Sequence, residues 1–332
     1  MNEPIRIPTF ADIQAAAGRI AGQAVVTPLL EYPALNARLG RRVFLKPEIF
    51  QRTGSFKFRG AYNRISIIPE SERGKGVVAF SSGNHAQGVA AAAALFKIPA
   101  TIVMPIDAPR SKIDGTKSYG AKVNFYDRRK EDREAIAAKL LAETGGTLVR
   151  PFDDPDIVAG QGTAGMEMVQ QAKALGVMLD RVFVPCGGGG VTAGVALAFA
   201  ALSPQTKVVP VEPTDYDGMG RSLRAGERTA APGKAASIAD SLQAPMPGVA
   251  PFGAAKALLS DALVVGDTEL SRAVSLAFRM LKLVVEPGGA AGLAGALETA
   301  GQTSDSAIGI LLSGGNADPE TIMQCCAAVP LP

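Results

Sequence analysis

The sequence of 332 residues has no tryptophan, one histidine and three cysteines, and these shortages exclude several classes of protein. Because His85 is the only histidine, a histidine-rich metal cluster or a Ser-His-Asp triad cannot be built elsewhere in the chain. Cys186, Cys325 and Cys326 are odd in number and lack the spacing of a disulfide framework or a metal site. This usage is typical of the reducing cytosol, so we expect a cytoplasmic protein.

Long apolar runs and blocks of like charge are also missing. The longest apolar run, around residues 88–96, is too short to span a membrane, and residues 1–10 lack the apolar stretch of a signal peptide. The 34 basic and 31 acidic side chains nearly cancel, leaving a formal net charge of +3. We therefore expect no nucleic-acid partner and no membrane partner.

Short β-rich runs alternate with alanine-rich helical segments along most of the chain. This alternation predicts βαβ units, and hence parallel sheets flanked by helices. The length favours two domains, or one domain with an inserted lobe. Residues 222–249, rich in glycine, proline and alanine, are predicted to be a surface excursion. We predict strands at 77–80, 100–104, 122–126, 181–184, 207–211 and 307–312, and helices at 85–97, from about 109, at 131–144, 191–201 and 267–281.

Four consecutive glycines, Gly187, Gly188, Gly189 and Gly190, lie between a predicted strand and a predicted helix. Without side chains, their N–H groups can form a concave nest, and the helix N-terminus adds partial positive charge. This combination predicts a phosphate site. The sequence does not continue as a nucleotide P-loop or a dinucleotide fingerprint would. The alternative is a flexible turn without a ligand.

Two further turns follow predicted strands and carry polar side chains. The first combines hydroxyls, an amide and free N–H groups of a helix start, which suits a carboxylate, and consists of Ser81, Ser82, Gly83, Asn84 and His85. The alternative is that this turn only caps the helix and that its histidine is structural. In the second turn, Ser313 either points into a crevice or only begins a helix. Ligands of parallel α/β folds bind at the carboxyl ends of strands, where all these turns belong.

Lys57 lies between two phenylalanines, Phe56 and Phe58. Apolar surroundings disfavour the ammonium form, so they favour the nucleophilic amine that a Schiff-base lysine needs. Lysines in such surroundings also occur on ordinary amphipathic helices. A candidate amine, a phosphate nest and a carboxylate cradle together match pyridoxal phosphate and an amino-acid substrate.

Several motifs in order resemble the threonine ammonia-lyase, serine dehydratase and serine racemase group of fold-type II pyridoxal-phosphate enzymes. They are KPE at 46–48, SFKFRGA at 55–61, SGNH at 82–85, AGQGT at 159–163, GGGG at 187–190, EP at 286–287 and SGGN at 313–316. The resemblance implies pyridoxal 5'-phosphate and a two-lobed α/β fold. It also implies a large cofactor-binding domain of residues 1–74 and 150–332, into which a small substrate-closing domain of residues 75–149 is inserted. Members are commonly dimers, so we expect a homodimer.

The resemblance also implies residue roles. Lys57 binds the cofactor and later moves the α-proton, Phe56 lies against the cofactor ring, and Asn84 hydrogen-bonds its phenolic oxygen. The four glycines hold the phosphate, and residues 81–85 receive the substrate carboxylate. Ser313 faces the pyridine nitrogen, where a neutral hydroxyl does not enforce protonation, so loss of β-hydroxide is favoured over transamination. The expected reaction is α,β-elimination of a β-hydroxy amino acid, threonine and also serine, giving a 2-oxo acid and ammonia.

Two residues bear on elimination versus racemisation. Ser82 occupies the position of the catalytic proton donor of racemases, whereas Phe152 resembles the dehydratases, because racemases carry asparagine there. Together they favour a dehydratase. Serine racemase and 3-hydroxyaspartate ammonia-lyase are the alternatives, although no motif places an arginine for the second carboxylate of hydroxyaspartate. A non-catalytic protein that binds the cofactor or an amino acid is a remote alternative.

A divalent-cation site is the last feature that the resemblance suggests. Racemase-like members use a glutamate, a carbonyl four residues on and an aspartate six residues on. Glu212 matches the first position, but Gly218 occupies the last, and Asp217 lies one residue early. Oxygen ligands suit Mg²⁺ or Ca²⁺, so Glu212 and Asp217 are the predicted ligands.

Overall fold

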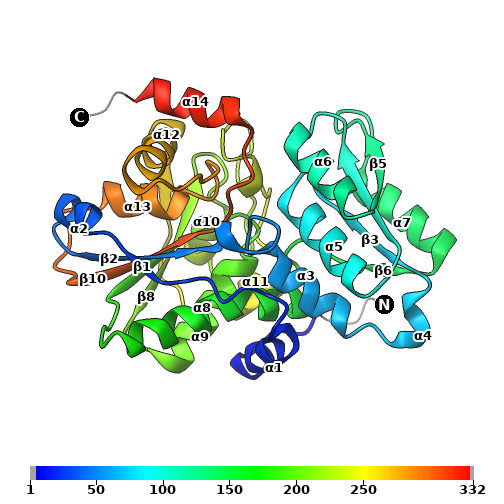
Figure 1. Cartoon of the computed structure of the whole chain (residues 1–332), viewed down its shortest axis with the longest axis horizontal. Coiled ribbons are helices and arrows are strands. Elements are labelled where there is room, and N and C mark those ends of the chain that lie inside the picture. Colours follow the sequence, from blue (N-terminus) through cyan, green and yellow to red (C-terminus); the bar gives the residue numbers. More distant parts are fainter. Residues whose placement is uncertain (1–4, 330–332) are drawn as a thin grey trace.

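A computed structural model of the protein describes residues 5–329, and its strands form two separate sheets (Figure 1). In the larger sheet the order is β1 (Leu30–Glu31), β2 (Arg42–Pro47), β10 (Ala307–Leu312), β7 (Arg181–Pro185), β8 (Lys207–Pro213) and β9 (Leu263–Val265). In the smaller sheet it is β5 (Lys122–Tyr126), β4 (Ala100–Pro105), β3 (Val77–Phe80) and β6 (Thr147–Leu148). Among these strands only β1 pairs antiparallel. The predicted fold class, parallel sheets in an α/β fold, is confirmed.

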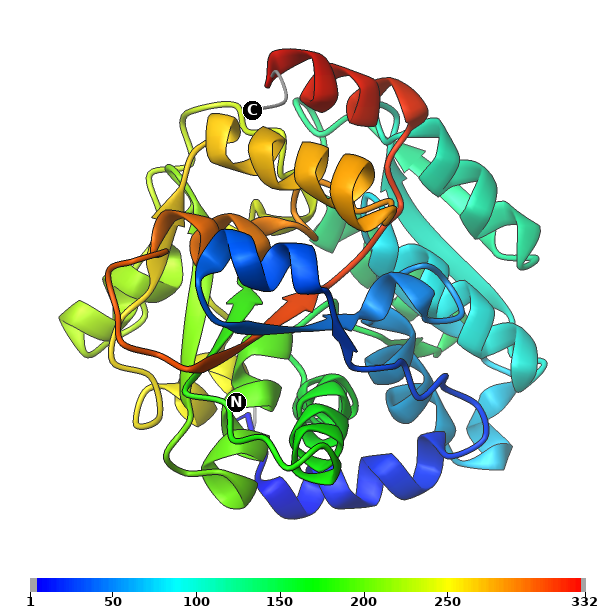
Figure 2. The same ribbon diagram turned by 60° about the vertical axis from the view of Figure 1, so that its left-hand side comes forward.

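Helices cover both faces of the larger sheet (Figures 1 and 2). One face carries α2 (Pro33–Leu39), α12 (Asp267–Leu276), α13 (Ala291–Glu298) and α14 (Pro319–Ala328), and the other carries α8 (Pro155–Ala174), α9 (Gly190–Leu202) and α11 (Val249–Ala255). Strand β10 shows why both faces are covered. Its Ile308, Ile310 and Leu312 enter the first core, and Ala307 and Leu311 enter the second, because alternate side chains of a strand point to opposite faces.

The smaller sheet follows the same rule. Val77 and Ala79 of β3 pack into a core shared with α5 (Asn84–Leu95), and Phe80 faces a smaller core beneath α7 (Arg133–Thr144). Helix α3 (Lys57–Ser66) packs against both α5 and α8, so it lies between the two sheets. Lys57, at the start of α3, is therefore held where the two halves of the molecule meet.

The remaining helices are short or lie at the edges of the sheets. They are α1 (Phe10–Ile20), α4 (Glu70–Arg73), α6 (Arg110–Ser118) and α10 (Gly218–Ala225), with 3-10 helices η1 (Glu48–Phe50) and η2 (Asp240–Leu242) and a π-helical turn η3 (Ala277–Leu281). The predicted helix 267–281 thus changes to π geometry after residue 276. The division at residues 74/75 and 149/150 stays a prediction, and residues 1–4 and 330–332 of the predicted large domain lie outside the described residues.

The prediction of a surface excursion for residues 222–249 is confirmed for residues 226–236, which form no helix or strand and are mostly exposed, but not for the ends of the segment. The segment begins inside α10 with buried Ser222, and its later part packs Ala239 and Leu242 into the larger core. Small residues let the chain turn inward there, where composition alone suggested exposure. Among residues 5–329, no helix has the length and apolar character needed to cross a membrane.

Candidate active site

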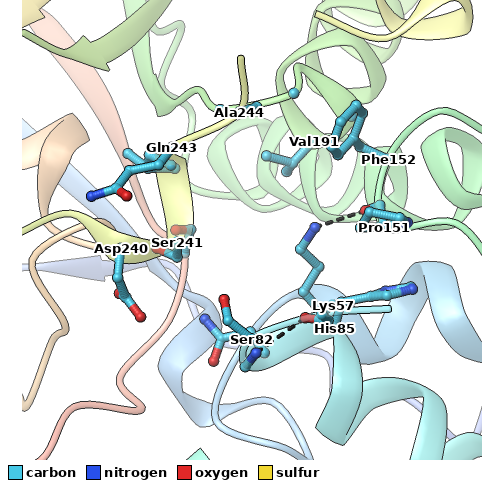
Figure 3. A pocket seen from close by; sticks show the side chains of 18 of the residues that line it. Lys57, Ser82, His85, Pro151, Phe152, Val191, Asp240, Ser241, Gln243 and Ala244 are labelled. Carbon is cyan, nitrogen blue, oxygen red and sulfur yellow. Dashed lines mark hydrogen bonds between the residues drawn. The ribbon is translucent and has the colours of Figure 1, made fainter. Parts of the chain in front are cut away.

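A cavity of about 180 Å³ lies at the carboxyl ends of β3, β7 and β10, where the two halves of the molecule meet. The structure brings to its wall every predicted cofactor and substrate residue: Phe56, Lys57, Ser81, Ser82, Gly83, Asn84, His85, Gly187, Gly188, Gly189, Gly190 and Ser313. Figure 3 shows the Lys57 amine pointing into this space between Phe152 and Val191 on one side and Ser82 on the other. Residues far apart in the sequence therefore form one site, and their individual roles stay predictions.

The Lys57 amine is the candidate nucleophile. Its Nζ donates a hydrogen bond to the Pro151 carbonyl at 2.7 Å and lies 5.2 Å from the centre of the Phe56 ring (Figure 3). Burial lowers the pKa of Lys57 to about 8, although the Glu286 carboxylate acts in the opposite direction. At pH 7 roughly a tenth of the amine is therefore unprotonated. This is the form that attacks an aldehyde.

The glycine turn leaves no room for side chains. A Cβ at Gly188 would collide with the Phe152 ring, and a Cβ at Gly190 would lie 2.6 Å from the Gln161 side-chain oxygen. Gly189 has φ +88°, in the left-handed region that favours glycine, and it precedes the first residue of α9. The turn thus presents backbone N–H groups and a helix N-terminus to the cavity, as a phosphate requires.

Gln161 strengthens this interpretation. It is buried in α8 and lines the cavity, yet neither its side-chain oxygen nor its nitrogen has a hydrogen-bond partner among the described residues. Unpaired buried polar groups are costly unless a ligand or water completes them. The space beside the glycine turn therefore fits a polar group such as the phosphate of the cofactor.

In the turn before α5, some side chains bond within the protein and others face the cavity. Asn84 donates to the Glu286 carboxylate and accepts a hydrogen bond from Asn316 at 2.8 Å. His85 Nε2 lies 2.9 Å from the Val149 carbonyl, which can only accept, so this nitrogen carries the proton. Burial, with the nearby Lys57, lowers the pKa of His85 to about 3. A neutral ring turned towards Val149 supports the structural interpretation of the His85 side chain.

The hydroxyls of Ser82 and Ser313 are available to ligands. Ser313 is buried, and its backbone is fixed because its N–H donates to the Gly289 carbonyl at 3.2 Å and its carbonyl accepts from the Phe56 N–H at 3.1 Å. Neither hydroxyl makes a hydrogen bond within residues 5–329. Both face the cavity, so they can serve the cofactor and the substrate.

The sequence interpretation missed a buried charge cluster at the edge of the cavity. Lys112 Nζ, on α6, lies 2.7 Å from an Asp240 oxygen and 3.2 Å from a Glu286 oxygen. Burial lowers the pKa of Lys112, but the two carboxylates raise it by more, so the lysine stays charged. Nothing in its local sequence marks Lys112, because its partners come from the other half of the molecule.

Arg133 is a second group that sequence reasoning missed. It begins α7, whose N-cap Asp132 accepts a hydrogen bond from the Glu134 N–H at 2.8 Å. The Arg133 guanidinium lies 5.1 Å from the centre of the Phe80 ring and lines the cavity. It forms no ion pair with any carboxylate in the described part of the chain, which leaves its charge available to a ligand.

The predicted cation ligands are engaged with the protein itself. The Glu212 oxygens accept hydrogen bonds from the N–H groups of Met219 at 2.7 Å and Gly220 at 2.9 Å, and Asp217 pairs with Arg221 at 2.8 Å. Burial raises the pKa of Glu212 to about 7. Within residues 5–329, no three metal-binding side chains gather at one point. The structure thus does not bring Glu212 and Asp217 together as ligands, and the cation site stays a prediction.

The fold and the cavity place a buried amine beside a glycine turn in an α/β protein, an arrangement that suits a phosphate-bearing cofactor. Comparison with known proteins gives the family: residues 20–314 match the model described as "Pyridoxal-phosphate dependent enzyme", and the chain belongs to this family. The resemblance and the cofactor inferred from the sequence are confirmed.

Three similar proteins illustrate the range of the family. L-threo-3-hydroxyaspartate ammonia-lyase of Saccharomyces cerevisiae is 43% identical, over 94% of this chain and 94% of its own length. Serine racemase of Schizosaccharomyces pombe is 39% identical, over 96% of this chain and 98% of its own. The crystal structure of a threonine deaminase from T.th. superimposes with a TM-score of 0.88 at 42% identity, covering 94% of this chain and 99% of that one. The family includes lyases and racemases of amino acids.

Proposed function

We propose that the protein removes the hydroxyl and amino groups of 3-hydroxyaspartate, giving oxaloacetate and ammonia. The observation that carries this proposal is the unpaired Arg133 guanidinium in the same cavity as the carboxylate turn at residues 81–85. A substrate with two carboxylates uses both features. Two relatives that are 43% and 44% identical to this chain are named L-threo-3-hydroxyaspartate ammonia-lyase, which supports the choice.

The α-carboxylate binds at the start of α5. There the free N–H groups of the first turn and the Ser82 hydroxyl face the cavity, and the helix N-terminus favours negative charge. The β-carboxylate then faces Arg133, whose planar guanidinium suits bidentate hydrogen bonding. Two anchors hold the Cα–Cβ bond in one orientation, which is the positioning that elimination needs.

The Lys57 amine takes the proton from Cα. Pyridoxal phosphate, when bound, supplies the electron sink for the electrons left on that carbon. The β-hydroxyl leaves with a proton as water, and the unsaturated amine that is released takes up water to become oxaloacetate and ammonia. Because Lys57 has a pKa of about 8, its amine can accept and return the proton near neutral pH.

Phe56, Gln161, Asn84, Ser313 and the glycine turn are the residues that would hold the cofactor. Ser82 is the candidate for a proton transfer on the opposite face, which would give a racemase side activity. Threonine and serine remain the second candidates, since the structural relative at 42% identity is a threonine deaminase. They lack the second carboxylate, so they would leave Arg133 unpaired.

The test measures 2-oxo acid release from L-threo-3-hydroxyaspartate, its erythro diastereomer, threonine and serine. In the Arg133→Gln variant we expect kcat/KM for hydroxyaspartate to fall roughly 100-fold, because a desolvated charge pair is lost, with a much smaller change for threonine. Arg129→Gln, an exposed arginine four residues earlier, is the matched control. A parent enzyme that prefers threonine, or an Arg133→Gln variant that loses both activities equally, would contradict the proposal.

A further inference from the structure

A second cavity, of about 220 Å³, lies beside the active site. The two cavities share Phe80, Arg133, Pro151 and Phe152 in their walls. The two cavities therefore adjoin along two aromatic rings and the Arg133 guanidinium. We call this second cavity the arginine chamber.

Three arginines from separate segments line the arginine chamber. Arg133 begins α7, Arg150 follows β6, and Arg228 follows α10. Arg228 is oriented by a hydrogen bond from its Nε to the Pro247 carbonyl at 2.8 Å. Arg150 is exposed, and its side chain makes no hydrogen bond within the described ranges.

Among residues 5–329, the positive charge of the arginine chamber is only partly balanced by carboxylates. Asp153 and Glu134 also line it, but neither lies within ion-pair distance of an arginine there. One Asp153 oxygen instead accepts a hydrogen bond from the Ala250 N–H at 2.9 Å. Three guanidinium groups thus converge where two carboxylates only partly balance them, and the excess charge attracts anions.

The opposite side of the active site has the reverse charge. A third cavity, of about 310 Å³, is lined by two cations that are both paired, Lys112 with Asp240 and Arg128 with Asp107 at 2.8 Å. Its wall also holds Glu286 and Asp318, so four carboxylates face two cations. An anion is repelled on this side and attracted to the arginine chamber.

We propose that the arginine chamber is the entrance through which a small dicarboxylate substrate reaches the active site, with Arg150 and Arg228 binding one of its carboxylates on the way. This inference rests on the proposed function and adds two specificity-determining residues to it. Arg133, which lines both cavities, passes the carboxylate from the chamber to the site. Arg150 and Arg228 touch the substrate only before it reaches Lys57, so they act on its capture and not on the chemical step.

The test compares charge variants of Arg150 in the holoenzyme. For hydroxyaspartate, Arg150→Gln should lower kcat/KM roughly threefold to tenfold through KM with kcat unchanged, and Arg150→Glu should lower it further. Arg150→Lys should retain the parent value. The threonine kcat/KM should stay constant across the series, because its net charge is zero. Arg228→Gln should also lower kcat/KM for hydroxyaspartate. Because this variant also loses the hydrogen bond to Pro247, its melting temperature shows whether the stability of the protein has changed.

Ionic strength and a distant charge provide the controls. Raising the salt from about 0.05 M to about 0.5 M should lower the parent kcat/KM for hydroxyaspartate and shrink the difference from Arg150→Glu, because salt screens exposed charges. Lys207→Gln removes the same charge at the start of β8, the end of the strand away from the site, and should change nothing. An Arg150→Glu variant with the parent kcat/KM, or an equal loss in Lys207→Gln, would overturn the inference.

Failure of the proposed function gives a different result. If the parent turns over threonine but not hydroxyaspartate, the proposed substrate is wrong, and the chamber is tested with succinate as an inhibitor of threonine turnover. An inhibition constant that rises severalfold in Arg150→Gln supports an anion-binding chamber. An inhibition constant that is the same in parent and variant overturns it.

Discussion

Two clusters of charged side chains lie near Lys57, and they differ in charge balance and in burial. The inner cluster lies behind α3 and joins β2, η1, α3 and α8; its members are Lys46, Glu48, Arg59 and Glu167. The cleft cluster lies at the edge of the active site and joins α6 to residues of the other half of the molecule; its members are Lys112, Asp240 and Glu286. The first has two charges of each sign, and the second has one cation between two carboxylates.

Arg59 is the centre of the inner cluster. Its guanidinium binds both oxygens of Glu48, at 2.7 and 2.8 Å, and both oxygens of Glu167, at 2.7 and 2.9 Å. Burial raises the pKa of Glu48, but Arg59 together with Lys46 and Thr27 lowers it by more, so the carboxylate is held ionised. Because Arg59 lies two residues after Lys57 in α3, the inner cluster fixes the helix that carries the amine.

The cleft cluster is less balanced in charge, and its members come from both halves of the molecule. The Asp240 side chain is 38% exposed, whereas the Glu286 side chain is 1% exposed. Burial raises the pKa of Glu286, and Lys112 only partly offsets this. Charges that are paired within one half of the molecule thus stabilise its structure. An unbalanced cluster across the cleft can change with protonation.

The largest loss of stability is expected for Arg59→Met in the inner cluster. The substitution leaves Lys46 as the one remaining cation of the cluster beside two carboxylates, Glu48 and Glu167, so the free energy of unfolding should fall by about 3–5 kcal/mol. Urea denaturation followed by circular dichroism measures it. The control is Arg42→Met, which breaks an exposed pair with Glu31 and should cost less than about 1 kcal/mol. Similar losses in the two variants would show that the inner cluster does not hold the fold.

A smaller effect is expected for Lys112→Met in the cleft cluster, because Asp240 reaches water and Glu286 can take up a proton. Losing the lysine raises the pKa of Glu286 further. A carboxyl with a raised pKa binds its proton more tightly in the folded state, so its contribution is full at low pH and lost as pH rises through the folded pKa. As the pH is raised from acidic to alkaline, the variant should therefore lose stability relative to the parent. Lys112→Arg should keep the parent profile in urea titrations at several pH values, and a pH-independent difference for Lys112→Met would contradict the prediction.

Local chemistry explains which parts the sequence could predict. Strands β3, β5 and β10 have the predicted bounds because their β-rich runs end at turn residues. Lys57 and the glycine turn could be predicted because an apolar-flanked amine and consecutive glycines carry their chemistry within a few residues. These features need no knowledge of which segments meet in space.

The missed residues depend on contacts between distant segments. Lys112 and Asp240 are 128 positions apart, and Asp240 lies between Ala239 and Leu242, which pack inward where a surface excursion is predicted. Arg133 begins an ordinary amphipathic helix, and only the packing of α7 over β3 brings it to the cavity. In the sequence, Phe152 only indicates a resemblance to the dehydratases, whereas the structure shows its ring against the glycine turn. Such roles belong to the tertiary structure.

The two clusters should also differ in their effect on the pKa of Lys57. Of the two clusters, only Glu286 raises the pKa of Lys57, while burial lowers it to about 8. Bond formation between the free amine and pyridoxal phosphate should therefore accelerate as pH rises through about 8 in the cofactor-free protein. In Glu286→Gln the midpoint should move to lower pH, because the charge that favours the ammonium is gone.

Glu48→Gln provides the control from the inner cluster, and it should leave the midpoint of Lys57 unchanged. The measurement is the rate of the absorbance change on mixing with pyridoxal phosphate over a pH series, with Lys57→Ala as the blank. A midpoint that moves in Glu48→Gln but not in Glu286→Gln would show that the inner cluster, and not the cleft cluster, affects the pKa of Lys57. A shift confined to Glu286→Gln would show that the cleft cluster sets the proton affinity of the amine. The inner cluster would then act only by holding α3 in place.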